Sequence, residues 1–213
     1  LSRGLGDVYK RQVITISIFI GAVIAIQMQL NIMSPLIPAY AVGLATRDVI
    51  LLEFSSSILC LILAGKVGSN IASEIGTMQV TEQIDALEIM GINSANFLIL
   101  PKIVAMVSFI PVLVVLSMFT GIIGGFLVAQ FTDMFPVSRY VYGLQSFFNE
   151  YYIWYSIIKT LFFAFVISSV SSYYGYRVKG GALEVGKAST DAVVVSSVMI
   201  LLLDVLLTKL LLQ

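Results

Sequence analysis

The lack of histidine, the single cysteine and the lack of net charge each argue against a class of function or bond. There is no histidine, so the chain lacks the commonest general base and the commonest metal ligand. The single cysteine, Cys60, lies in an apolar run; it has no partner for an internal disulfide and is interpreted as a small core residue. Twelve basic residues balance twelve acidic residues, and this zero net charge argues against nucleic acid as a partner.

Charge of either sign is also scarce. Charged residues make up 11% of the 213 residues, against roughly 25% in a soluble domain. Hydrophobic residues make up 59%, and the mean hydropathy is +1.00. A chain this apolar has too little polar surface for water, whereas in a bilayer the lipid solvates its outer face. The composition therefore predicts an all-α, polytopic membrane protein.

Five apolar segments are long enough to cross a bilayer, which takes about 20 residues. We place them at about residues 13–33, 44–65, 97–131, 152–174 and 192–212. The third would measure roughly 50 Å as a straight helix, against a hydrocarbon core of about 30 Å, so we expect a kink at Pro111. No loop is long enough for a soluble domain. Residues 13–213 are therefore interpreted as one transmembrane domain, and the polar residues 1–12 as a non-family or foreign leader.

Lysine and arginine in the short loops predict the orientation of the spans. With the N-terminus inside, the inner side holds Lys10, Arg11, Lys66, Lys102, Arg177, Lys179 and Lys187. The outer side holds Arg47, Arg139 and Lys209. This bias predicts a cytoplasmic N-terminus and, after five crossings, a periplasmic C-terminus.

The longest polar stretch between spans covers residues 65–101, on the side assigned to the cytoplasm. Within it, Val80, Ile84, Leu87 and Gly91 have helical spacing, and Glu82, Asp85 and Glu88 follow another face. The pattern predicts a short amphipathic helix with an acidic stripe. One interpretation is a helix lying under the headgroups, although such helices are usually rich in Lys and Arg. The other is a docking helix whose carboxylates meet basic groups of a cytoplasmic partner.

Residues 74–91, EIGTMQVTEQIDALEIMG, closely resemble the signature AELGTM-x-VTEQIDALE-x-MG of the MlaE permease family. These are the permeases of the ABC transporters associated with MCE-domain proteins. Further similarity lies in AGKVGS at residues 64–69, LPK at 100–102, the GGA segment from Gly180, and the D-x-x-LT ending at 204–208. The resemblance covers about residues 16–212 and lacks the family's interfacial helix before the first span.

The resemblance implies the transmembrane subunit of an ABC transporter that moves phospholipids or related lipids between the inner and outer membranes of a bacterial cell. The chain would be a multi-pass inner-membrane protein and no enzyme itself; it would bind no cofactor, because ATP and Mg are used by a separate ABC ATPase subunit. Its other partners would be an MCE-domain periplasmic lipid-binding protein, a second copy of the chain, and phospholipid. The coupling helix that docks on the ATPase would involve Glu74, Thr77, Met78, Thr81, Glu82, Gln83, Asp85, Ala86, Leu87 and Glu88.

Several ionisable residues lie in or at the ends of the apolar segments, where a charge costs about 2.5–3.5 kcal/mol on insertion scales. Structural ion pairs between helices would explain them, and so would a polar lining for a lipid headgroup path. In the resembling family, matching polar positions line or support a central cavity at the permease dimer interface, and Asp48 stands where that family usually has Glu. The implied cavity residues are Gln27, Arg47, Asp48, Lys159 and Asp204; Glu53 has no counterpart.

Two other functions are open to an apolar chain of this kind. A stand-alone secondary transporter or channel for an amphiphilic solute often shows inverted repeats, and the sequence shows no internal repeat. An intramembrane enzyme would need catalytic groups, and no nucleophile–base pair or metal site is evident. Residues 181–187 resemble the opening of a P-loop, but Ala188 stands where that loop needs Ser or Thr for magnesium.

Overall fold

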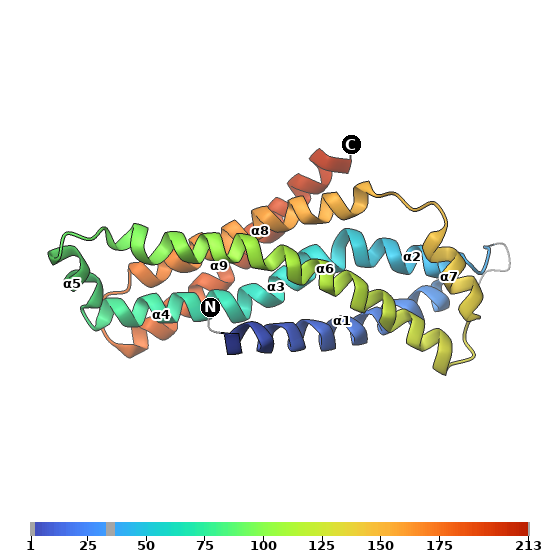
Figure 1. Ribbon diagram of the computed structural model, residues 1–213, viewed down its shortest axis with the longest axis horizontal. Coiled ribbons are helices and arrows are strands. Elements are labelled where there is room, and N and C mark those ends of the chain that lie inside the picture. Colours follow the sequence, from blue (N-terminus) through green and yellow to red (C-terminus); the bar gives the residue numbers. More distant parts are fainter. Residues whose placement is uncertain (1–2, 33–36, 213) are drawn as a thin grey trace. The chain divides into compact units, whose positions relative to one another are not determined.

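The computed structural model describes residues 3–32 and 37–212, and every regular element in those ranges is helical (Figure 1). Five helical segments are long and apolar enough to cross a membrane. They are Val8–Asn31, Ala41–Val80, Ala95–Phe131, Tyr151–Tyr176 and Ala182–Leu212. The predicted all-α, polytopic membrane architecture with five spans is confirmed.

The second segment is much longer than expected, because helical structure continues without a break from Ala41 to Val80. It consists in order of α2 (Ala41–Val49), the π-helix η1 (Ile50–Ile58), α3 (Leu59–Leu63), the π-helix η2 (Ala64–Gly68) and α4 (Ser69–Val80). The expected end of this span at residue 65, followed by a loop, is wrong. The reason is that α4 is amphipathic: it buries Ile71, Ala72, Ile75 and Gly76 and exposes polar residues between them.

The remaining spans differ less from expectation. The first is α1 (Arg3–Asn31), and the third combines the π-helix η3 (Ala95–Ile99) with α6 (Leu100–Phe131). Helix α6 passes through Pro111, where the kink remains a prediction. The fourth is α8 (Tyr151–Tyr176), close to its predicted bounds. The fifth is α9 (Ala182–Leu212), which begins well before residue 192. Two shorter helices, α5 (Gln83–Ile89) and α7 (Val137–Gln145), lie between spans.

The chain divides into two compact units, and each is described by itself. Unit 1 comprises the residues up to Ser56 together with Val112–Ile158, and unit 2 comprises Ser57–Pro111 and Lys159–Gln213. Helices α6 and α8 and the π-helix η1 contribute residues to both units.

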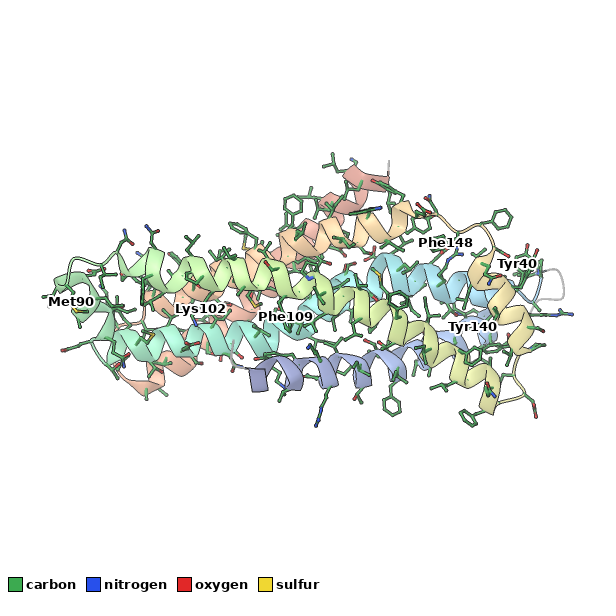
Figure 2. All side chains as sticks on the ribbon, viewed as in Figure 1. Tyr40, Met90, Lys102, Phe109, Tyr140 and Phe148 are labelled. Carbon is green, nitrogen blue, oxygen red and sulfur yellow. The ribbon has the colours of Figure 1, made fainter. Side chains whose placement is uncertain are left out.

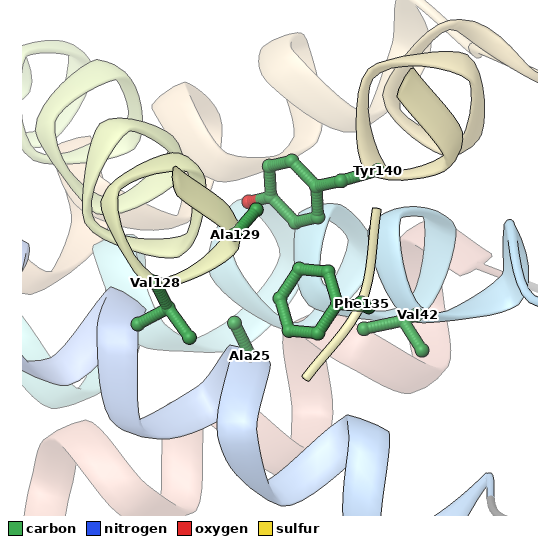
Figure 3. Close-up of a cluster of buried hydrophobic side chains, with 6 residues drawn as sticks. All are labelled: Ala25, Val42, Val128, Ala129, Phe135 and Tyr140. Atoms are coloured by element: carbon green, nitrogen blue, oxygen red, sulfur yellow. The ribbon is translucent and has the colours of Figure 1, made fainter. Parts of the chain in front are cut away.

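The core of unit 1 is built around the aromatic residues of α7 and of the segment before it (Figure 3). Phe135 and Tyr140 pack with ring centroids 5.7 Å apart, and the Tyr140 hydroxyl donates a hydrogen bond to the Ile122 carbonyl at 3.2 Å. Smaller side chains complete the cluster: Ala25, Val42, Val128 and Ala129. This core fixes α7 against α2 and α6.

Glycines bring α1 and α6 into backbone contact in the same unit. A Cβ added at Gly21 would lie 2.0 Å from the Gly121 carbonyl oxygen, and one added at Gly124 would lie 2.1 Å from that of Ile18. A Cβ at Gly125 would lie 2.2 Å from the Tyr140 hydroxyl. The Gly121-x-x-x-Gly125 pattern therefore serves close packing, as small residues do between membrane helices.

In unit 2, α4 packs along α9 and against α8 (Figure 1). The contact with α8 is close because small residues face each other: a Cβ at Gly175 would lie 2.7 Å from the Ala72 carbonyl oxygen. Likewise, a Cβ at Gly68 would lie 2.9 Å from the Ser171 hydroxyl. This packing holds the end of α4, and with it the start of α5, against the α8–α9 connection.

Candidate functional site

The acidic segment at residues 80–91 is not one helix. Helix α4 ends at Val80, and the Thr81 hydroxyl donates back to the Thr77 carbonyl at 2.8 Å. Glu82 then adopts a left-handed backbone with φ 58°, and α5 begins at Gln83. The expectation that Val80 and Glu82 share a helix with Ile84 is therefore wrong, because the positive φ breaks the periodicity between them.

Helix α5 is amphipathic. Ile84 is buried at 1% exposure, whereas Gln83, Asp85 and Ala86 are exposed and Leu87 is half-buried. Just after the helix, Met90 is 65% exposed at the tip of the segment (Figure 2). Within the described chain, neither the Glu82 nor the Asp85 carboxylate has a hydrogen-bond or ion-pair partner. These two carboxylates are consequently accessible to a basic partner.

The third acidic residue, Glu88, is engaged inside the chain. Its Oε1 accepts hydrogen bonds from the Ser94 hydroxyl at 2.9 Å and from the Tyr176 hydroxyl at 3.0 Å. The Ser94 and Tyr176 hydroxyl oxygens also lie 2.9 Å apart. Glu88 thus joins α5 to the C-terminal end of α8. Sequence reasoning missed both hydroxyl partners, since nothing near Glu88 in the sequence points to Tyr176.

The other residues expected in the coupling segment lie on α4. Glu74 accepts a hydrogen bond from the Lys102 ammonium at 2.6 Å, which ties α4 to the first turn of α6 (Figure 2 labels Lys102). The Thr77 hydroxyl donates to the Ser73 carbonyl at 2.7 Å, and Met78 is half-buried. Glu74 and Thr77 are exposed, and they lie on α4 rather than on α5.

In unit 1, the charged residues of α2 are engaged with α7. Arg47, 2% exposed, pairs with Asp48 at 2.8 Å and donates to the carbonyl oxygens of Leu144 and Ser146 at 2.9 and 2.7 Å. Its guanidinium also lies over the Phe148 ring, 5.7 Å from the centroid. Arg47 therefore satisfies carbonyl groups at the C-terminal end of α7, as basic side chains do at helix ends.

Gln27 stands apart from that pair. It is exposed on α1, and its amide has no partner among the described residues. The structure therefore brings Arg47 to Asp48 but links Gln27 to neither by a hydrogen bond.

In unit 2, Lys159 of α8 and Asp204 of α9 form an ion pair, with 2.5 Å between Nζ and Oδ1. Asp204 also accepts a hydrogen bond from the Ser57 hydroxyl at 2.8 Å, and the Thr208 hydroxyl lies 3.5 Å from the Lys159 ammonium. Lys159 is fully buried and the Asp204 side chain is 18% exposed. Ser57 and Thr208 were not anticipated from the sequence, although Thr208 follows Asp204 by one helical turn.

In the described ranges no three His, Cys, Asp or Glu residues gather closely enough to hold a metal ion. The P-loop-like segment is helical from Ala182 onward, so Gly186 and Lys187 lie inside a helix rather than in a phosphate-binding loop.

Comparison with known proteins places this arrangement in a family. The model of the family described as Permease MlaE matches residues 11–210. A probable ABC transporter permease protein of Rickettsia bellii is 40% identical over 70% of this chain and 58% of its own length. A probable ABC transporter permease protein of Synechocystis, slr1045, is 32% identical over 76% of this chain and 61% of its own length. The chloroplastic protein TRIGALACTOSYLDIACYLGLYCEROL 1 of Arabidopsis thaliana is 31% identical over 74% of this chain and 45% of its own length.

The chain thus spans 58% of the length of the Rickettsia relative it matches. The family match covers nearly all of the five spans, the whole of α5, and both ion pairs, Arg47–Asp48 and Lys159–Asp204. The chain belongs to the MlaE permease family.

Proposed function

We propose that this chain is the transmembrane permease subunit of an ABC transporter that moves phospholipids or related lipids between the inner and outer membranes of a bacterial cell. Relatives named as probable ABC transporter permeases support the transporter class. The Arabidopsis relative carries the name of a glycerolipid, which favours a lipid as the cargo.

The observation that carries the proposal is the segment formed by Glu82 and helix α5, which lies between two spans and has two carboxylates with no partner among the described residues. Glu82 and Asp85 are exposed, while Ile84 anchors the helix to its own unit. A surface helix that only rested on the membrane would present Lys and Arg to the headgroups. Exposed carboxylates suit a protein partner with a basic groove, and charge-assisted hydrogen bonds to such a groove are roughly twice as strong as neutral ones.

The partner that fits α5 is a separate ABC ATPase subunit, which binds and hydrolyses ATP with Mg. Two ATPase sites call for two permease chains, so a second copy of this chain completes the transporter. An MCE-domain periplasmic lipid-binding protein receives or delivers the lipid on the other side. The excess of Lys and Arg on the α5 side supports an orientation with that helix and the N-terminus in the cytoplasm and the C-terminus in the periplasm.

For the lipid path, we assign headgroup contact to polar side chains in otherwise apolar spans. Lys159 and Asp204 can offer a cation and an anion at once, and Gln27 is exposed, with an amide that has no partner among the described residues. Arg47 and Asp48 of α2 support the path indirectly, because the Arg47 guanidinium is engaged with Asp48 and with carbonyl groups at the end of α7 and so has a positioning role.

Charge reversal on α5 tests the proposal. The variant Glu82→Lys with Asp85→Lys should no longer retain the ATPase subunit that co-purifies with the wild-type protein, because like charges would face each other. Glu184→Lys with Asp191→Lys is the matched control, since both residues are exposed on α9 and lie outside α5. Equal ATPase retention by both variants would contradict the proposal, and is what a stand-alone transporter or channel would show.

A further inference from the structure

We propose that Tyr176 is a positioning residue: when the ATPase displaces α5, the Tyr176 hydroxyl makes α8 move with it. The inference rests on the proposed function, since it assumes that a partner moves α5. It adds the route by which that movement enters the membrane-spanning part of unit 2.

The tie is a compact polar cluster. The Glu88 carboxylate accepts from Ser94 at 2.9 Å and from Tyr176 at 3.0 Å, through the same oxygen. Ser94 is 2% exposed, so its part of the cluster is shielded from water. Hydrogen bonds to a charged acceptor are stronger than those between neutral groups. The cluster can therefore hold two helices together under load.

Helix α8 has no other hydrogen bond to α5. Helix α5 is joined to α4 through the backbone at Thr81 and Glu82, and to α6 through residues 90–94 and η3. Apart from the two bonds that Glu88 accepts from Ser94 and Tyr176, the only side-chain hydrogen bond of α5 in the described chain runs from Gln83 to Thr81. Without the Tyr176 hydroxyl, which contacts both Glu88 and Ser94, no hydrogen bond among the described residues would join α8 to this cluster.

The packing of α8 on α4 cannot replace this tie. That contact consists of small residues in backbone proximity, such as Gly175 over Ala72. Close packing resists compression, but it does not resist separation in the way a directional hydrogen bond does. A movement of α5 away from α8 is transmitted to α8 more directly when a directional bond joins the two helices than when packing alone does.

Helix α8 leads from the tie to the buried ion pair. Tyr176 is its last residue, and Lys159 lies on the same uninterrupted helix, about 26 Å away at 1.5 Å per residue. A packed helix shifts as a unit by small sliding motions. Displacement at Tyr176 therefore changes the position of Lys159 relative to Asp204 on α9.

The variant Tyr176→Phe removes the hydroxyl and keeps the ring. In the full complex with its ATPase, reconstituted into vesicles of phosphatidylethanolamine and phosphatidylglycerol, we expect normal ATPase retention and near-normal ATP hydrolysis. The lipid transferred per ATP hydrolysed should fall at least about fivefold, the lower range of coupling between two sites. Tyr174→Phe, two residues earlier on α8, should leave this ratio unchanged, because no hydrogen bond of its hydroxyl is present in the described chain.

A second variant separates coupling from folding. Glu88→Gln keeps an oxygen acceptor for both hydroxyls, so it should retain most of the transfer per ATP that Tyr176→Phe loses. An unchanged ratio in Tyr176→Phe would overturn the inference, and so would loss of ATPase binding in that variant, which would show a merely structural tie. Absence of ATP-driven transfer by the wild-type complex would instead refute the proposed function on which the inference rests.

Discussion

Lys159 on α8 and Asp204 on α9 meet in an ion pair of 2.5 Å, between two helices that are otherwise strongly apolar. The hydroxyl of Ser57 adds a hydrogen bond to the same carboxylate. Burying these charges costs free energy that the pairing only partly offsets. We therefore expect the removal of one partner to destabilise the protein more than the removal of both.

Asp204→Leu alone should destabilise the protein by about 3–5 kcal/mol, because it leaves the Lys159 ammonium buried without its carboxylate. Lys159→Leu together with Asp204→Leu should be much less destabilising, since no unpaired charge remains. The free energy of unfolding in detergent micelles would measure both. A double variant as unstable as the single variant would show that the pair is not the dominant interaction of either residue.

The same double variant decides between the two interpretations of the in-membrane charges. If Lys159 and Asp204 meet the lipid headgroup, the folded double variant should lose lipid transport in reconstituted vesicles. Transport at the wild-type rate would leave the pair a purely structural role. Leu144→Met, an apolar exchange in unit 1 that keeps the backbone carbonyl bound by Arg47, is a suitable control for handling losses.

Close backbone contact between α1 and α6 predicts that Gly124→Ala is destabilising. The added Cβ would lie 2.1 Å from the Ile18 carbonyl oxygen, so the helices must move apart, at a cost of about 1–3 kcal/mol. Gly186→Ala on α9 is the control: nothing lies within 4 Å of its Cβ position, and alanine is the better helix former. In thermal unfolding, the Tm of Gly124→Ala should lie below that of the wild type. The Tm of Gly186→Ala should equal or exceed the wild-type value.

Arg47→Lys should destabilise unit 1 even though the charge is kept. A lysine ammonium cannot span Asp48 and the carbonyls of Leu144 and Ser146 as the guanidinium does, and an unpaired buried carbonyl costs about 1–3 kcal/mol. Arg139→Lys should stay within about 0.5 kcal/mol of the wild type, because Arg139 is exposed and its side chain has no partner in the described chain. Protease cleavage in the segment after α7 should likewise be faster in Arg47→Lys than in Arg139→Lys.

The spans could be predicted because lipid solvation imposes long apolar runs that composition alone reveals. The length of the second span could not be predicted in this way. Helix α4 alternates buried Ile71 and Ile75 with polar neighbours, and such a pattern fits a loop until its partner α9 is known. Periodicity also failed at Glu82, because a glutamate with positive φ has no sequence signal, whereas glycine would have suggested the break.

The charges of the site illustrate the same limit. The sequence shows that charged residues lie in the spans. The pairing of Lys159 with Asp204, however, depends on how α8 and α9 pack. Glu88 is predicted to face a partner protein with Glu82 and Asp85; its hydrogen bond from Tyr176 within the chain could not be read from the sequence. Local spacing gives the face of a helix, whereas long-range packing decides what that face meets.

Lipid transfer by the reconstituted complex tests the central claim most directly. The wild-type chain would be placed in vesicles with its ATPase and MCE-domain partners, and the movement of a labelled phospholipid to acceptor vesicles would be followed. The account predicts transfer that requires both hydrolysable ATP and the ATPase subunit. Transfer at the same rate without the ATPase, or none with every partner present, would contradict it.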